Sequence, residues 1–181
     1  MINPSSTPTL AQLEQEARRR GLLLRLQVGR PAGLAWGLRV GVARRRDGAD
    51  GASPLQLLGE LKGWALPTSS GLRLDTMRVQ GRDTAAVGPL IWAATFAWAL
   101  EVTPCRQATL LAIRDQEAQH RLLVRYFRQL GFRPLRELGA GAADLAPRLL
   151  WGGAGLLMRG DCTEGLARTA RRLAGREPLR P

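Results

Sequence analysis

The chain has 181 residues, of which 45% are hydrophobic and 23% are charged. These values are typical of a folded globular protein, so the composition excludes a wholly disordered chain, and the length predicts a single domain. Lys and Arg number 27 against 15 Asp and Glu, which gives a net charge of +12, and Lys62 is the only lysine. Because such an arginine excess can reflect compositional bias, it does not by itself establish an anionic partner.

Cysteine usage and the apolar segments indicate the cellular compartment of the protein. The two cysteines, Cys105 and Cys162, lie far apart and form no C-x-x-C motif, which excludes an evident zinc ribbon or disulfide framework. The N-terminal segment lacks the basic and apolar regions of a secretory signal. The longest uncharged run, residues 84–100, has 17 residues and is typical of a buried helix. We therefore expect a cytoplasmic protein with no membrane span and no metal.

Hydrophobic periodicity and turn residues predict the order of the elements. Thr9 is a suitable N-cap for the first helix, and Gly59 and Gly63 would allow a bulge or a close backbone approach in the third strand. The expected elements are a helix over 10–20, strands over 22–28, 34–43, 55–66 and 72–79, a helix over 87–102, a strand over 108–113, a helix over 116–130, and strands over 132–138 and 149–158. Residues 139–147 are expected to form a loop.

This order predicts an α/β or α+β fold, with a mixed, largely antiparallel central sheet and helices on both of its faces. One domain is expected over 9–158. A disordered lead rich in proline, serine and threonine is expected over 1–8, and an arginine-rich tail, with a short helix around 166–173, over 159–181.

Two segments resemble the core of the GNAT (N-acetyltransferase) acyl-CoA superfamily. The segment LRLDTMRVQGRDTAAVGPLIW, residues 72–92, resembles that family's central strand and pyrophosphate loop. The segment ATLLAIRDQEAQHRLLVRYFRQLGF, residues 108–132, resembles its late strand and the helix that closes with an aromatic residue four positions before the glycine of Gly-Phe. The run LLWGGAG, residues 149–155, is similar to GNAT-like proteins of cyanobacteria and plastids.

The resemblance implies a GNAT-like acyl-CoA N-acyltransferase fold and the transfer of an acyl group from acetyl-CoA, or another acyl-CoA, to an amine by direct attack. A strand that turns into a helix N-terminus suits such a cosubstrate, because backbone N–H groups and the positive end of the helix dipole point at its pyrophosphate. The residues expected to contact it are Val79, Arg82, Ala86, Val87, Gly88 and His120.

The loop also departs from the family pattern. Asp83 stands where a cation or an amide is usual, and Ala86 stands where the first glycine is usual. The same residues are compatible with an ordinary helix start after a strand, so that interpretation stays open.

The general acid of the family is a tyrosine, and its position is occupied here by Phe127. Tyr126, the only tyrosine, is adjacent, but one residue turns a side chain ~100° around a helix. Tyr126 is therefore either the acid that protonates the leaving thiolate or a core residue with its hydroxyl at the edge.

Asp75 is the candidate base for the amine. Strict alternation places Met77 and Val79 on its face, and burial there would raise its pKa; the alternative is an ion pair with Arg73. His120, the only histidine, either contacts the cosubstrate or acts as a base, or it is a surface or boundary histidine.

Two classes of function remain. The first is an N-acyltransferase, and the second is a catalytically degenerate binding or assembly module with an anionic partner, which the departures at Ala86 and Phe127 favour. Nucleic acid is the less favoured partner, because the arginine clusters accompany no helix-turn-helix or zinc finger, and aromatic residues are only 5% of the chain.

Overall fold

The computed structural model describes residues 7–46, 54–82, 84–139 and 141–175. The strands are β1 (Leu23–Gly29), β2 (Trp36–Arg45), β3 (Leu55–Ala65), β4 (Leu72–Val79), β5 (Gln107–Ile113), β6 (Arg133–Leu138) and β7 (Gly155–Asp161). The helices are α1 (Leu10–Arg19), α2 (Val87–Val102), α3 (Glu117–Gln129), α4 (Leu145–Trp151) and α5 (Cys162–Ala174), with short 3-10 turns at Pro31–Gly33 and Ala142–Asp144.

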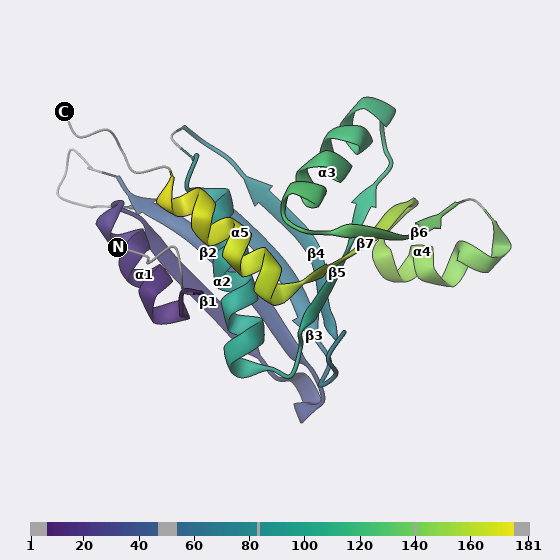
Figure 1. The fold of residues 1–181 in the computed structure, drawn as a ribbon, viewed down its shortest axis with the longest axis horizontal. Helices are drawn as coiled ribbons and strands as arrows, with labels where there is room; N and C mark the ends of the chain where they lie inside the picture. Colours follow the sequence, from purple (N-terminus) through teal and green to yellow (C-terminus); the bar gives the residue numbers. More distant parts are fainter. Residues whose placement is uncertain (1–6, 47–53, 83, 140, 176–181) are drawn as a thin grey trace.

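All seven strands belong to one sheet, in the order β1-β2-β3-β4-β5-β7-β6 (Figure 1). Every neighbouring pair is antiparallel except β4 and β5, which are parallel. A mixed, largely antiparallel sheet is therefore confirmed. The last strand, β7, lies between β5 and β6 rather than at an edge.

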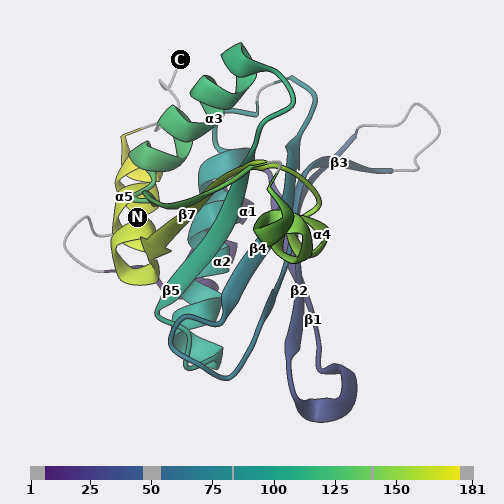
Figure 2. The same cartoon turned by 90° about the vertical axis from the view of Figure 1, so that its right-hand side faces the viewer.

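Helix α2 is the centre of the core. It is apolar all round, and every residue from Val87 to Ala99 except Pro89 is buried, because the sheet covers one side and other helices cover most of the rest. Helices α1, α2 and α5 lie on one side of the sheet, and the short α4 lies on the other (Figure 2). The expected helices on both faces are present, but the two faces are covered very unequally.

The C-terminal segment belongs to the folded domain. The boundary expected at residue 158 falls inside β7, which continues to Asp161, and α5 then packs along α2. Gly165 makes this packing close, because a Cβ at that position would lie 2.6 Å from Cε2 of Phe96. The arginine-rich tail expected from residue 159 is thus a strand and an amphipathic helix as far as Ala174.

Helix α4 replaces part of the expected loop and the start of the expected last strand. It ends at Gly152, whose φ of +75° is left-handed, and β7 begins only at Gly155. No helix in the described ranges combines the length and the apolar character needed to cross a membrane.

Candidate functional site

Strands β4 and β5 are paired over only three residues each. Leu72–Leu74 pairs in parallel with Ala108–Leu110, and among the described residues the pairing does not continue to the strand ends at Val79 and Ile113. On its other edge β4 stays paired with β3 as far as Val79. The later part of β4 therefore has no ladder on its β5 side, and an extended ligand could use the backbone groups of that edge for hydrogen bonds.

A β-bulge interrupts β4 where this separation begins. Leu74 and Thr76 pair with adjacent residues of β3, which leaves Asp75 as an extra residue between them. The bulge reverses the alternation, so the prediction that Asp75 shares a face with Met77 and Val79 is wrong. Met77 is half-buried on the α2 side, whereas Asp75 is exposed on the opposite face.

The surroundings of Asp75 suit a base. Partial burial of the Asp75 carboxylate raises its pKa above the usual aspartate value. The charge of Arg73 and a hydrogen bond from Trp64 act in the opposite direction but do not outweigh the burial. Arg73 lies between two rings, with its Cζ 4.9 Å from the Trp64 centroid and 5.0 Å from the Trp151 centroid. Arg73 makes no direct ion pair with Asp75, so it influences the carboxylate across space rather than by contact.

Among the described residues, no side chain caps the N-terminus of α2. Ala86 is the N-cap residue, and Val87 and Gly88, both buried, begin the helix. This first turn lies directly on β3, because Gly59 has no side chain: a Cβ there would lie 2.7 Å from Cγ1 of Val87. The N–H group of Val87 donates to the carbonyl oxygen of Thr84 at 2.9 Å, so the prediction that the Val87 N–H contacts the cosubstrate is wrong. The turn offers an anion the N–H groups of Ala86 and Gly88 and the positive end of the helix dipole.

The two other residues expected near this turn precede it in the chain. Val79 ends β4 and Arg82 follows in the connecting segment, and both are exposed. Asp83, where the family pattern has a cation or an amide, lies outside the described residues.

Tyr126 reaches from α3 to the first turn of α2. Its Oη accepts a hydrogen bond from Nε1 of Trp92 at 2.8 Å, and a Cβ on Gly88 would lie 3.7 Å both from this Oη and from Cε of Met77. Phe127 packs instead against Trp92, with their ring centroids 6.2 Å apart in an edge-on arrangement. Of the two adjacent aromatic residues, it is therefore Tyr126 that presents a polar group near Gly88 and the unpaired part of β4.

His120 is buried near the beginning of α3, so it is not a surface histidine, while the alternative of a boundary histidine stays open. Its Nδ1 lies 3.2 Å from the carbonyl oxygen of Ile113, the last residue of β5, which occupies one ring nitrogen locally. Six residues separate His120 from Tyr126, about 240° around a helix, so the two side chains point in different directions.

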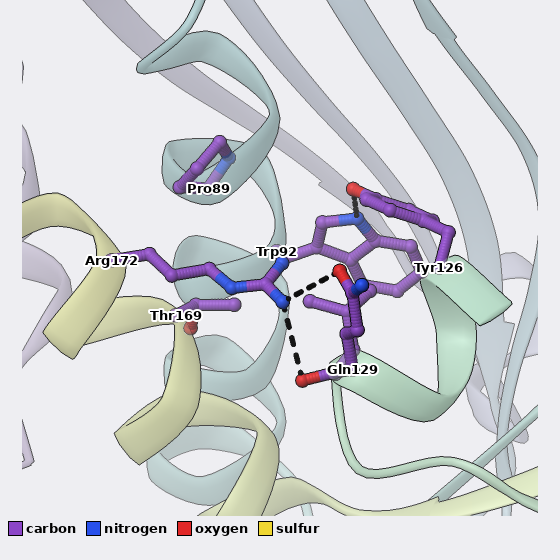
Figure 3. Close-up of a pocket in the computed structure, with 7 residues that line it drawn as sticks. Pro89, Trp92, Tyr126, Gln129, Thr169 and Arg172 are labelled. Carbon is purple, nitrogen blue, oxygen red and sulfur yellow. Dashed lines mark hydrogen bonds between the residues drawn. The ribbon is translucent and has the colours of Figure 1, made fainter.

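A cavity of about 380 Å³ opens beside Tyr126, between α2, α3 and α5 (Figure 3). Across its rim, Nη2 of Arg172 donates a hydrogen bond to Oε1 of Gln129 at 3.1 Å. Sequence reasoning misses these contributions, since it assigns Trp92 to the core and Arg172 to a tail. The residues that line the cavity are Pro89, Trp92, Tyr126, Gln129, Leu130, Thr169 and Arg172.

The two cysteines do not have the surroundings of a nucleophile. Both are buried, and Sγ of Cys105 donates a hydrogen bond to the carbonyl oxygen of Leu66 at 3.3 Å. Burial, with the nearby charge of Asp161, raises the pKa of the Cys162 thiol to about 12, so this thiol stays protonated near neutral pH.

The structure brings Tyr126, Gly88 and Met77 together on the α2 side of the sheet and places Asp75 on the other side, where β4 leaves β5. No group of three or more His, Cys, Asp or Glu among the described residues is placed to hold a metal ion. No protein-family model and no curated protein sequence matches the chain.

Proposed function

We propose that the protein is an acyl-CoA-dependent N-acyltransferase with a GNAT-like fold. The observation that carries the proposal is the position of the Tyr126 hydroxyl beside Gly88, at an uncapped helix start that adjoins the unpaired part of β4. Such a place offers a backbone edge for an extended chain, N–H groups for a pyrophosphate and an acid for a leaving thiolate. The resemblance of residues 72–92 and 108–132 to the GNAT superfamily supports the same proposal.

The residues of the chain fit acetyl-CoA or another acyl-CoA as cosubstrate. The pyrophosphate is held by backbone N–H groups of Ala86 and Gly88, with Arg82 supplying a positive charge. The N–H group of Val87 already donates to the carbonyl oxygen of Thr84 and is not part of this cradle. The cavity beside Tyr126 adjoins this turn through Pro89, so it can take a further part of the same molecule.

The proposed reaction is a direct attack. The acceptor nitrogen forms a bond to the thioester carbonyl carbon, and the carbon–sulfur bond breaks. Asp75 accepts the proton that the amine loses, and Tyr126 donates a proton to the departing sulfur. The two groups lie on opposite faces of the sheet, so the amine and the thiol occupy different sides of the reacting carbon.

Calorimetry with CoA, acetyl-CoA and AMP tests the binding step. We expect CoA and acetyl-CoA to bind and to stabilise the fold, by ~2.7 kcal/mol at one hundred times the Kd. AMP, which has the nucleotide base but neither the pyrophosphate nor the pantetheine arm, is the control and should bind far more weakly. Absence of CoA binding would overturn the proposal.

The second candidate is a binding module that no longer catalyses. It is favoured by Phe127, which occupies the family's tyrosine position and is packed into an aromatic cluster, and by Ala86 in place of the first glycine. Acyl transfer to a broad panel of amines separates the two candidates. CoA binding without transfer to any amine supports the module, and transfer excludes it.

A further inference from the structure

In the part of the chain that the structure describes, one face of the sheet carries no helix over β1, β2 and β3 (Figure 2). On β2, Leu38, Val40 and Val42 are buried toward α2, and Arg39, which lies between the first two, turns to the other side and is exposed. We call this other side of β1–β4 the open face. Side chains that are paired across neighbouring strands share a face, so the register determines which residues lie on it.

Positive charge dominates the open face. In the described strands its cations are Arg25, Arg39, Arg45, Lys62, Arg73 and Arg78, and its carboxylates are Glu60 and Asp75. Six cations against two carboxylates leave a net charge of +4 on four strands. An acidic partner can therefore reach several cations at once on this face.

The cations stand further out than the carboxylate between them. Glu60 forms an ion pair with Arg39 and lies 3.5 Å from Nζ of Lys62, and its side chain is 18% exposed. The Arg39 and Lys62 side chains are 52% and 51% exposed, so they retain N–H groups that face solvent. The Arg39 guanidinium accounts for the largest lowering of the Glu60 pKa, so Glu60 stays ionised and orients both cations.

The aromatic residues of this face are already occupied. Trp64 is stacked on Arg73, and the other side of the same guanidinium lies 5.0 Å from the ring centroid of Trp151. A face that binds single-stranded nucleic acid would normally offer free rings for the bases to stack on. The surface therefore fits carboxylates better than nucleotides.

A flat strip on the same face allows a chain to approach closely. Gly29 and Gly37 are paired, and a Cβ at either position would have no atom within 4 Å. On an extended peptide, carboxylates two residues apart point to the same side and lie ~6.8 Å from one another. Every second side chain of the strands beneath has the same spacing and also points to one side. An extended acidic segment can thus lie over several of these cations at once.

We propose that the open face binds an acidic peptide segment and presents an amine of that segment to Asp75. This inference rests on the proposed acyltransferase function, because it names the acceptor class of the same site. Asp75 lies within the same face, at the bulge that borders Lys62 and Arg73, so a peptide held by these cations brings its amine to the base.

Binding is tested without acyl-CoA, so that its result does not depend on the acyltransferase proposal. The probe is a short fluorescent peptide with a central lysine flanked by glutamates, and its control has glutamines in their place. We expect the glutamate peptide alone to bind at ~0.15 M salt. The variant Arg39→Gln with Lys62→Gln should weaken this binding by about tenfold.

A second variant separates a surface effect from a loss of net charge. Arg18→Gln with Arg171→Gln removes two exposed cations from α1 and α5, on the other side of the sheet, and should leave the affinity unchanged. Equal losses in the two variants would overturn the proposal, as would equal affinity for the two peptides. Tighter binding of a single-stranded RNA of similar charge would also overturn it, in favour of a nucleic-acid surface.

The acceptor role is tested by adding acetyl-CoA to the same mixtures. We expect kcat/KM for the glutamate peptide to exceed that for the glutamine peptide about tenfold, and this preference to disappear only in the Arg39→Gln, Lys62→Gln variant. Equal kcat/KM values for the two peptides, with transfer observed, overturn the acceptor class while the acyltransferase function stands. Peptide binding with no CoA binding removes the acyltransferase function and overturns the acceptor role.

Discussion

The indole Nε1 of Trp92 donates a hydrogen bond to the hydroxyl oxygen of Tyr126 at 2.8 Å, and this bond joins α2 to α3. The tyrosine oxygen accepts in this bond, so its position is held by a residue that is itself fixed in the core. A general acid needs such an orientation, because proton transfer depends on geometry first and on pKa second.

Removing this hydroxyl distinguishes a catalytic role from a structural one. If Tyr126 is the acid, Tyr126→Phe lowers turnover by ~10²–10⁴ without changing the affinity for CoA. Loss of the bond to Trp92 also lowers the free energy of unfolding by ~0.5–1.5 kcal/mol. Steady-state kinetics and urea unfolding measure the two effects. A stability loss with an unchanged rate would contradict the catalytic assignment.

Substitutions at Gly88 probe the space in front of the helix start. A Cβ there would make only ordinary contacts, 3.7 Å from Met77 and Tyr126, so Gly88→Ala should fold normally and weaken CoA binding modestly. Gly88→Val adds further methyl groups where the phosphates approach and should abolish binding while the fold persists. Calorimetry with CoA, beside circular dichroism, measures this series. Wild-type affinity in Gly88→Val would contradict the placement of the pyrophosphate.

The raised pKa of Asp75 predicts a pH-dependent stability. The folded protein holds this proton more tightly than the unfolded chain, so the ionised carboxylate costs stability once the pH exceeds the unfolded aspartate pKa of ~3.9. Asp75→Asn should therefore be more stable than the wild type at neutral pH, and the difference should vanish below that value. Urea unfolding at several pH values measures it.

Asp144 supplies the control of opposite sign. Its pKa is lowered chiefly by a hydrogen bond from the Gly139 N–H, so its ionised form stabilises the fold above the unfolded pKa. Asp144→Asn should be less stable than the wild type at neutral pH, and this loss should shrink as the pH falls. If both variants change stability in the same direction at neutral pH, the assigned surroundings of Asp75 are wrong.

The packing of α5 on α2 has its own test. Gly165→Ala places a Cβ 2.6 Å from the Phe96 ring and should cost ~1–3 kcal/mol, because a close-packed core cannot absorb an added methyl group. Gly41→Ala, where the new Cβ would lie 3.7 Å from Leu57, is the matched control and should be nearly neutral. Similar urea midpoints for the two variants would mean that α5 does not pack as described.

The cysteines of the native protein should react only slowly with thiol reagents. Cys105 and Cys162 are both buried, and the Cys162 thiol, with a pKa of about 12, has almost no thiolate at pH 8. Alkylation of the native protein at that pH should be slow, and both thiols should react once urea unfolds the chain. Mass spectrometry counts the modified residues, and rapid labelling of either thiol in the native protein would contradict the burial.

The sequence predicts the bounds of those elements that depend on residues close together in the chain. The capping box at Thr9 and Gln12 fixes the start of α1, and the bounds of β4 and α2 follow from alternation and from an unbroken apolar run. Gly59 and Gly63 also indicate special backbone positions. Gly59 lets α2 approach β3, and Gly63 lies at the bulge, where a Cβ would be 2.5 Å from the Arg73 carbonyl oxygen.

The missed features depend on partners that are distant in the sequence. A bulge is a property of two strands, so alternation along β4 alone cannot reveal that Asp75 and Met77 face opposite sides. Helix α4 contains Pro147 and is followed by glycines, and both residue types usually indicate the end of a helix. Proline is tolerated here because it lies in the first turn. Arg172 lines the cavity only because α5 packs against α2. An arginine-rich composition does not predict that packing.

The place of β7 between β5 and β6 imposes an order on folding during synthesis. Until residues 155–161 have left the ribosome, β5 and β6 have no strand between them and each exposes an unpaired edge. The first four strands pair only with sequence neighbours and can form a meander early, whereas the other half of the sheet must wait for a late insertion. A chain cut before Gly155 would consequently lose both the strand that joins β6 to the rest of the sheet and the helix α5, which covers α2.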